Sequence, residues 1–226
     1  MRVERMGASI PYGPMLALQE ARHHEVRADV ARETLFLLEH SSVVTLGKNA
    51  SRDNLRLEID DYRPRNIEVV ETGRGGDVTW HGPGQIVGYP ILHFGEHERD
   101  IRKYVWNLEE VMIRTAADYG VVAERVDGLR GIWVGQEKLA AIGVRVARWT
   151  TLHGFAFNVC PDLTNFDLIV PCGIEDKGVT SLERLMGMTC PSITEVQDRL
   201  CVHLAEVLDR ELVEASPSML AQPLDR

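Results

Sequence analysis

Cys172 lies in a sequence context that favours a reactive thiol. Pro171 fixes the backbone before it, and Gly173 after it leaves the thiol uncrowded. A structural cysteine more often lies within a periodic apolar run. The other cysteines either follow that pattern or precede a proline without a flanking glycine: Cys160, Cys190 and Cys201. Cys172 is therefore the candidate nucleophile.

A thiol with its ordinary pKa of about 8.5 is mostly protonated at neutral pH, so it needs a nearby cation or base. The candidates are Lys138, Lys177, His81 and His153. Lys138 starts an apolar run that is typical of a strand, so its amine can point into a partly dry cleft. Lys177 follows two acidic residues, a context that favours a solvated surface position. Either histidine is also compatible with a purely structural role.

The glycine-rich stretch at residues 73–90 predicts a backbone wall against which a ligand lies. Two glycine clusters flank an alternating run of five residues that ends at His81. Glycine permits positive φ and close approach of backbone to a ligand. The stretch leads into strand-like sequence rather than a helix, which excludes the common phosphate-binding loops. A simple hairpin remains the alternative, and Arg74 and Asp77 can pair with each other.

Helices and strands must bring these distant residues together, since Lys138 and Cys172 are 34 positions apart (172 − 138). The apolar spacing predicts helices over residues 11–32 and 102–119, and Ser192 with Glu195 forms a capping box before a third. The first helix is expected to bury Leu16, Leu18, Ala21, Val26 and Val30. The expected strands cover residues 33–39, 42–47, 55–59, 66–72, 85–92, 121–125, 131–134, 138–146 and 152–159. Residues 160–177 are expected to be rich in loops.

Composition limits the classes of protein to which the chain can belong. The 226 residues are 44% apolar and 26% charged, as in soluble globular proteins. The net charge of −9 disfavours binding to bulk nucleic acid or anionic membranes. The sequence has no signal-peptide pattern and no Cys-x-x-Cys spacing, so we expect a cytoplasmic protein without disulfides or a zinc site. One catalytic domain is expected over residues 1–214, with a frayed tail at 215–226.

Four separated motifs, in order along the chain, resemble those of the lipoyl(octanoyl) transferases, which are octanoyl-carrier-protein:protein N-octanoyltransferases. The resemblance covers roughly residues 33–186 and departs from the family pattern at Asp77, Trp80 and Phe157. The motifs are Arg74-Gly-Gly-Asp-Val-Thr-Trp-His-Gly-Pro-Gly-Gln85, Lys138-Leu-Ala-Ala-Ile-Gly143, His153-Gly-Phe-Ala-Phe-Asn158, and Pro171-Cys172-Gly173 with Val179-Thr-Ser-Leu182.

The resemblance implies an α+β fold shared with biotin and lipoate protein ligases, namely a mixed, largely antiparallel sheet flanked by helices. It implies an acyl-thioester on Cys172 and a general acid/base at Lys138 that lowers the thiol pKa. It implies no cofactor and no metal. The residues that it implies for substrate binding are Arg74, Gly75, Gly76, Asp77, Val78, Thr79, Trp80, His81, Ala141, Ile142, Gly143, Gly154, Phe155 and Ala156.

The resemblance also implies two protein partners in protein lipoylation and lipoate biosynthesis. The donor is octanoyl-acyl carrier protein, through its phosphopantetheine arm. The acceptors are lipoyl domains of 2-oxoacid dehydrogenase complexes and the glycine cleavage H protein, with no nucleic acid and no membrane involved. Two alternatives remain. An ATP-dependent lipoate or biotin ligase on the same fold needs no nucleophilic cysteine, and a non-catalytic lipoyl-binding module leaves Cys172 without a role.

Overall fold

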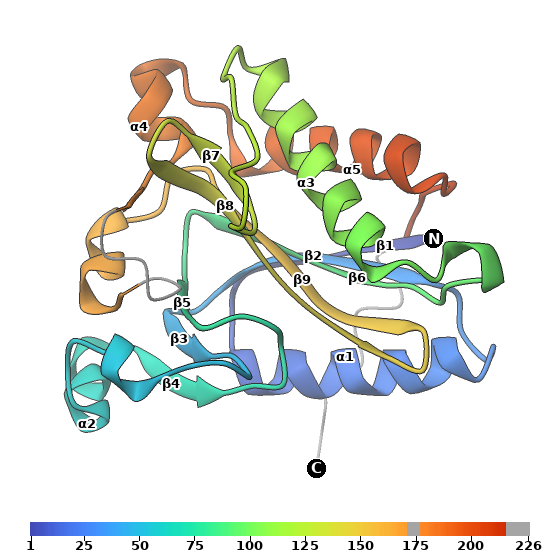
Figure 1. Ribbon diagram of the computed structural model, residues 1–226, viewed down its shortest axis with the longest axis horizontal. Helices are drawn as coiled ribbons and strands as arrows, with labels where there is room; N and C mark the ends of the chain where they lie inside the picture. Colours follow the sequence, from blue (N-terminus) through green and yellow to red (C-terminus); the bar gives the residue numbers. More distant parts are fainter. Residues whose placement is uncertain (171–176, 216–226) are drawn as a thin grey trace.

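A mixed sheet forms the centre of the molecule in the computed structural model, which describes residues 1–170 and 177–215 (Figure 1). Its strand order is β10-β8-β9-β6-β2-β1-β11, and β7 pairs with β8. The central pairs, from β8 through β9 and β6 to β2, are antiparallel, whereas β1 and β10 pair in parallel at the margins. The strands are β1 (Arg2–Ile10), β2 (Thr34–His40), β6 (Gln85–Ile91), β7 (Ile132–Val134), β8 (Glu137–Ala147), β9 (Thr150–Asn158), β10 (Gly178–Val179) and β11 (Val213–Glu214).

A second, smaller sheet lies beside the first and carries the glycine-rich stretch at its edge. Its order is β4 (Glu68–Glu71), β3 (Val43–Leu46) and β5 (Val78–His81). Two short helical segments, α2 (Ile59–Tyr62) and η4 (Leu163–Leu168), help to enclose its core, which includes Trp80 and Phe166. Together the two sheets confirm the prediction of a single α+β domain with a mixed, largely antiparallel sheet.

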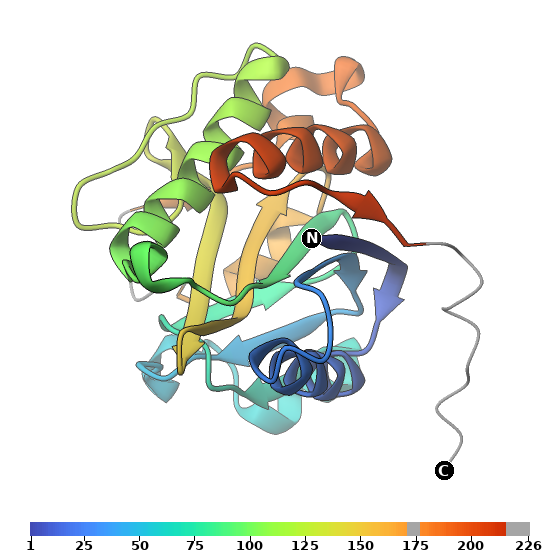
Figure 2. The same ribbon diagram turned by 90° about the vertical axis from the view of Figure 1, so that its right-hand side faces the viewer.

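Helices cover both faces of the central sheet (Figures 1 and 2). On one face lie α3 (Ile101–Asp118) and α5 (Ile193–Leu208), which pack over the largest apolar core. On the other lies α1 (Tyr12–Arg27), over a smaller core that includes Leu38, Val87 and Ala156. Among the described residues, the remaining short helices are α4 (Leu182–Met186), η1 (Arg52–Asn54), η2 (Arg63–Arg65), η3 (Glu96–Glu98) and η6 (Gly187–Thr189). Within the described ranges, no helix combines the length and the hydropathy that crossing a bilayer needs.

The capping box before α5 is confirmed. The Ser192 side chain accepts the Glu195 backbone N–H, and the Glu195 carboxylate accepts the Ser192 N–H at 2.8 Å. The helix at residues 102–119 and most predicted strands are also confirmed. After α5 in the sequence, the chain forms β11, which pairs in parallel with β1. Both ends of the described chain therefore lie at the same margin of the central sheet (Figure 2).

Three predictions of local structure are wrong. Residues 55–59 form no strand, because the chain there runs between two short helical turns and makes a single bridge from Leu55 to Ile169. Residues 121–125 contribute one isolated bridge instead of a strand. Of the residues predicted to be buried on α1, Val26 is buried, Leu16 and Leu18 are half-buried, and Ala21 and Val30 are exposed. The rest of its buried face consists of Tyr12, Met15, Gln19 and His23. The first strand, β1, was not predicted.

Candidate functional site

The glycine-rich stretch forms a tight loop, and hydrogen bonds from the Arg74 side chain stabilise it. The guanidinium of Arg74 is buried and donates to the backbone carbonyls of Thr45 and Asp77, each at 2.6 Å. Gly76, with φ +87°, lies in the left-handed region that favours glycine. The Asp77 carboxylate accepts from the Asn54 amide at 2.6 Å. Arg74 therefore holds the loop through Asp77's backbone, and Asp77 in turn orders the segment that follows β3.

This loop rests directly on strand β8. The Gly75 N–H donates to the Val144 carbonyl at 3.0 Å, and a Cβ added to Gly143 would lie 3.0 Å from the Gly75 carbonyl oxygen. Such close contact leaves little room for a side chain at position 143, so the loop would have to shift to accept one. The small residues of the two motifs thus let one backbone segment lie against the other.

The loop, β8 and β9 enclose a cavity, which we call the inner chamber. Most of the predicted binding residues line it, together with residues from α1 and β6. Its lining consists of Tyr12, Arg74, Gly76, Asp77, Thr79, His81, Val87, Tyr89, Ala141, Ile142, Gly143, His153, Gly154, Phe155 and Ala156.

Three of the predicted binding residues are absent from that lining. Val78 and Trp80 alternate with Thr79 and His81 along β5, so they point into the core of the small sheet. The Trp80 indole N–H donates to the Ser42 hydroxyl at 2.9 Å. Gly75 instead joins the loop to β8.

A β-bulge turns Lys138 toward the inner chamber. Ile132 pairs with Ala140, but the next residue, Trp133, pairs with Lys138, so β8 carries one extra residue at Leu139. Leu139 and Ala140 consequently both face the large core, although neighbours in a regular strand face opposite sides. Without the bulge, Lys138 would face that apolar core.

Lys138 lines a second, smaller space, the Lys138 cavity, which adjoins the inner chamber. The two share Thr79, Ala141 and Ala156. The Lys138 cavity is lined by Thr79, Gln85, Lys138, Ala141, Ala156, Asn158, Phe166 and Val179.

The Lys138 amine is positioned against an aromatic face. Lys138 is 7% exposed, and its Nζ lies 4.8 Å from the centre of the Trp133 ring. Lys177 approaches the same ring at 5.4 Å and also donates to the Gln136 amide oxygen. A cation over an aromatic ring is stabilised by the ring quadrupole. Lys138 is thus the more buried of the two lysines that share one indole.

A chain of hydrogen bonds joins the glycine-rich stretch to Lys138. The His81 Nδ1 lies 2.7 Å from the Gln85 amide oxygen, the Gln85 amide donates to Asn158 at 2.9 Å, and the Asn158 amide donates to the Thr180 carbonyl at 2.9 Å. The Thr180 N–H then donates to the Lys138 carbonyl at 3.0 Å. Because an amide oxygen only accepts, His81 carries its proton on Nδ1 in this arrangement.

Gln85, Asn158 and Thr180 are absent from the predicted site set. Each is at most 3% exposed. A signal for two of them exists in the sequence, because Gln85 and Asn158 are uncharged polar residues at the ends of otherwise apolar strands. Buried polar groups of this kind are stable only when they are paired.

The imidazoles around the inner chamber are uncharged at neutral pH. Burial lowers the pKa of His81 to about 3, with a further contribution from His40. Burial lowers the pKa of His40 to about 4, and the same effect, with the charges of Arg74 and Arg145, lowers the pKa of His153 to about 4. These groups therefore act there as hydrogen-bonding groups and not as cations.

The predicted nucleophile, Cys172, lies outside the described residues, as do its neighbours Pro171 and Gly173. The cysteines that the structure does describe are poor nucleophiles. Burial raises the pKa of Cys160 and of Cys190, in both cases with nearby acidic charge, and burial raises the pKa of Cys201 to about 11.

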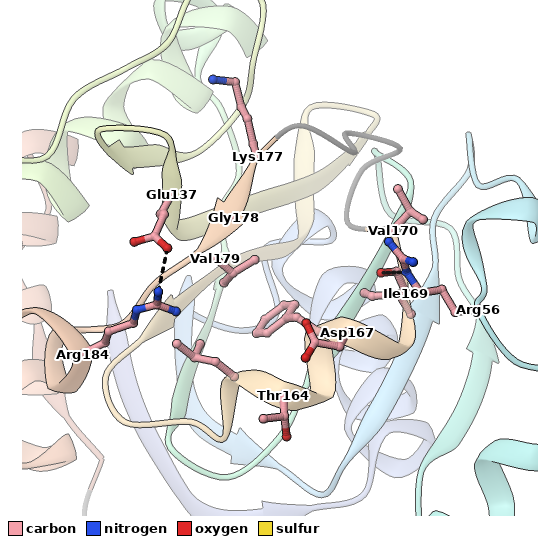
Figure 3. A pocket seen from close by; sticks show the side chains of 12 residues that line it. Arg56, Glu137, Thr164, Asp167, Ile169, Val170, Lys177, Gly178, Val179 and Arg184 are labelled. Carbon is pink, nitrogen blue, oxygen red and sulfur yellow. Dashed lines mark hydrogen bonds and ion pairs between the residues drawn. The ribbon is translucent and has the colours of Figure 1, made fainter.

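A wide polar groove of about 530 Å³ opens beside the Lys138 cavity (Figure 3). The two share Phe166 and Val179. In Figure 3 the Arg184 guanidinium reaches the Glu137 carboxylate, at 3.2 Å. The groove, the Lys138 cavity and the inner chamber thus adjoin one another in that order.

Comparison with known proteins places the chain in one family. Residues 11–205 match the family model of the lipoyl protein ligase A/B catalytic domain. The octanoyltransferase of Syntrophotalea carbinolica is 45% identical over 208 residues, covering 92% of this chain and 94% of that protein. The octanoyltransferase of Myxococcus xanthus is 42% identical over 223 residues, covering 96% of this chain but 62% of the relative. The structure of lipoate-protein ligase A bound with ATP superimposes with a TM-score of 0.75 at 16% identity, covering 97% of this chain and 91% of the other.

Proposed function

Because the chain belongs to the lipoyl protein ligase A/B catalytic-domain family, we propose that it is an octanoyltransferase of protein lipoylation. In this proposal the donor is an octanoyl thioester on the phosphopantetheine arm of acyl carrier protein. The acceptor is the lysine amine of a lipoyl domain, such as those of 2-oxoacid dehydrogenase complexes or the glycine cleavage H protein. The observation that carries the proposal is a buried lysine turned by a bulge into a cavity that adjoins the inner chamber.

The first half-reaction forms an acyl-enzyme. The thiolate of Cys172 attacks the thioester carbonyl, a new S–C bond forms, and the bond to the pantetheine sulfur breaks. Lys138, as the ammonium, favours the thiolate and then gives its proton to the leaving sulfur. One thioester replaces another, so this step needs no other source of free energy.

The second half-reaction passes the acyl group to nitrogen. The acceptor lysine attacks the Cys172 thioester as the neutral amine, its N–C bond forms, and the bond to the Cys172 sulfur breaks. Lys138, now neutral, takes the proton that the attacking nitrogen loses. Conversion of a thioester to an amide is favourable, so the reaction requires no ATP.

Lys138 is a better candidate for the base than either histidine. A general base works best with a pKa near the working pH. Burial lowers the pKa of His81 to about 3 and that of His153 to about 4, which makes both weak bases at neutral pH. Lys177, whose amine is bound to Gln136 beside the groove, is the remaining alternative.

The inner chamber suits the acyl chain, and the outer groove suits the carrier arm. Val87, Ala141, Ile142, Phe155 and Ala156 supply apolar surface along the chamber. The order of groove, Lys138 cavity and chamber allows the thioester carbonyl to meet Lys138 while the alkyl chain lies along β8 and β9.

The test is transfer in the absence of ATP. The full chain is mixed with octanoyl-carrier protein and an isolated lipoyl domain, and the mass of the lipoyl domain is followed. The proposal predicts the gain of one octanoyl group. If the lipoyl domain gained mass only when ATP and free octanoate were added, the chain would be an ATP-dependent ligase instead. If it gained no mass under either condition, the chain would be a non-catalytic binding module.

A further inference from the structure

The end of the inner chamber away from Lys138 is built from polar side chains, which an alkyl chain alone does not need. Along β8, Ala141 adjoins the Lys138 cavity, and Val144, three residues further on, pairs with His153 on β9. At about 3.3 Å per residue this separation is roughly 10 Å. Tyr89 of β6 lies beside His153, and Tyr12 of α1 also lines the chamber.

His153 reaches this end through an unusual backbone conformation. Its neighbours Leu152 and Gly154 face the α1 side of the sheet, so regular alternation would point His153 into the opposite core. His153 has φ +58°, in the left-handed region, and lines the chamber instead. Its ring lies edge-on to Tyr89, with ring centres 6.5 Å apart. Strain of this kind is found where the position of a side chain matters.

A buried residue of α1 supports this conformation. The Gln19 amide oxygen accepts the His153 backbone N–H at 3.1 Å, and Gln19 is fully buried. Gln19 thereby satisfies a backbone donor at the position where the strand turns. Two polar residues on the buried face of α1 are therefore part of this region, since Tyr12 lines the chamber and Gln19 bonds to His153.

The hydrogen-bonding state of His153 differs from that of the tyrosines beside it. The Tyr89 hydroxyl lies 2.7 Å from the His40 Nε2, and Tyr12 is hydrogen-bonded to Thr72. His153 is 2% exposed, and its Nδ1 has no hydrogen-bond partner among residues 1–170 and 177–215. A buried polar atom without a partner is costly, and such atoms are rare in native proteins.

From these observations, and on the premise of the proposed function, we infer that His153 reads the distal end of the acyl chain. Its ring closes the chamber, and its Nδ1 provides a hydrogen bond for a polar or polarisable group at the end of a chain of octanoyl length. The preferred ligand class is therefore an acyl chain of this length with a hydroxyl at its distal end, alongside the plain alkyl chain. His153 is a specificity-determining residue and takes no part in proton transfer.

The test compares octanoyl and ω-hydroxyoctanoyl thioesters of the carrier protein by kcat/KM. The wild-type enzyme is expected to use both within about tenfold of each other. His153→Leu keeps the bulk of the side chain and removes the ring nitrogens, so the hydroxylated chain is expected to lose about 10- to 100-fold relative to octanoyl. His153→Asn tolerates the left-handed backbone and keeps a hydrogen-bonding group, so it is expected to restore the wild-type ratio.

The matched control is His97→Leu, the same change at an exposed histidine, which is expected to leave the ratio unchanged. A ratio that is equal in wild type and His153→Leu overturns the inference, as does a wild-type enzyme that rejects the hydroxylated chain. Failure of plain octanoyl to form any acyl-enzyme would overturn the proposed function instead, so the two failures are distinguishable.

A second measurement needs no variant, in case His153→Leu does not fold. Nitrogen NMR of histidine-labelled wild-type protein reports the state of the His153 Nδ1. Binding of ω-hydroxyoctanoate is expected to shift this resonance, whereas octanoate leaves the nitrogen without a new partner. Equal shifts with both acids would contradict a hydrogen bond at the chain end.

Discussion

At each end of the inner chamber, a local irregularity in a strand turns a polar side chain out of the core, but the two side chains differ in their chemistry. At one end a β-bulge turns Lys138 out of the core, and at the other a left-handed residue turns His153 out of it. The first side chain is a lysine held over the Trp133 ring. The second is an imidazole whose pKa burial lowers to about 4, so it is neutral at pH 7. Under the proposed function, the lysine at one end moves the proton, whereas the neutral imidazole at the other end contacts the acyl chain without exchanging one.

Lys138 gives the largest expected effect. Lys138→Ala should lower the rate of transfer by about 10³-fold, since general acid–base catalysis contributes roughly 10² to 10⁴. Lys138→Arg should still form some acyl-enzyme, because arginine keeps the positive charge, but it should pass the acyl group on very slowly because arginine does not release a proton. Single-turnover mass measurements separate the two half-reactions.

The matching variant at the other end is His153→Asn, which should keep transfer of octanoyl within a few-fold of wild type. If Lys138→Arg transferred octanoyl at a near-normal overall rate, Lys138 would contribute only its positive charge and would not act as the base. Unchanged alkylation of Cys172 as a function of pH in Lys138→Ala would remove Lys138 from the site and favour Lys177.

Gly143 and Gly154, which pair between the two ends of the chamber, allow effects on protein stability to be separated from effects on substrate binding. A Cβ at Gly154 would overlap the Gly88 carbonyl oxygen within the sheet, so Gly154→Ala should lower the free energy of unfolding by about 3 kcal/mol. A Cβ at its partner Gly143 would meet the Gly75 oxygen at 3.0 Å, where the loop can retreat. Gly143→Ala should cost about 1 kcal/mol and raise KM about tenfold.

Urea unfolding and steady-state kinetics on both variants check this contrast. A bulkier change at the loop itself, Gly76→Val, combines a branched side chain with φ +87° and should weaken acyl binding while Cys-directed reagents still label the folded protein. Equal losses of folding and binding in all three variants would make the glycine-rich stretch a structural turn.

The buried imidazoles predict a dependence of stability on pH. The folded-state pKa values of His40, His81 and His153 lie at about 4, 3 and 4, below the ordinary value of 6.5. The unfolded state therefore binds more protons below pH 6.5, so stability is complete above this pH and falls as the pH drops toward 4. Each imidazole contributes a slope of about 1.4 kcal/mol per pH unit over that window.

Urea midpoints at pH 7 and pH 5 measure how steeply the stability depends on pH. His153→Asn removes one of the three imidazoles, so it should reduce this slope by about 1.4 kcal/mol per pH unit. A slope that His153→Asn leaves unchanged would mean that His153 is not held neutral in the folded protein, which would weaken the contrast between the two ends.

The smallest effect is expected far from both ends. Ser192→Ala removes the cap of α5 and should lower the free energy of unfolding by about 1 kcal/mol, with kcat/KM unchanged. Thermal unfolding and the transfer assay provide the two readouts. A loss of activity beyond the loss of folded protein would show that α5 influences the chamber.

The sequence predicts the sheet, the main helices and the glycine-rich stretch because apolar periodicity and glycine clusters are local signals. It fails at α1, where Gln19 and His23 are buried and hydrophobicity suggested another face. Gln19 is buried because it supports His153, a contact between residues 134 positions apart. The bulge at Leu139 is equally non-local, since it depends on the pairing of β8 with β7. Residue spacing along one segment carries neither piece of information.

The most direct test of the central claim is the location of the acyl group on the enzyme. The full chain is incubated with octanoyl-carrier protein without ATP or acceptor, quenched in acid, and analysed by intact and peptide mass. We expect one octanoyl group, on Cys172, and its loss in Cys172→Ser. An adduct on Cys160, Cys190 or Cys201, or a protein that transfers octanoyl to the lipoyl domain without ever carrying it, would contradict the account.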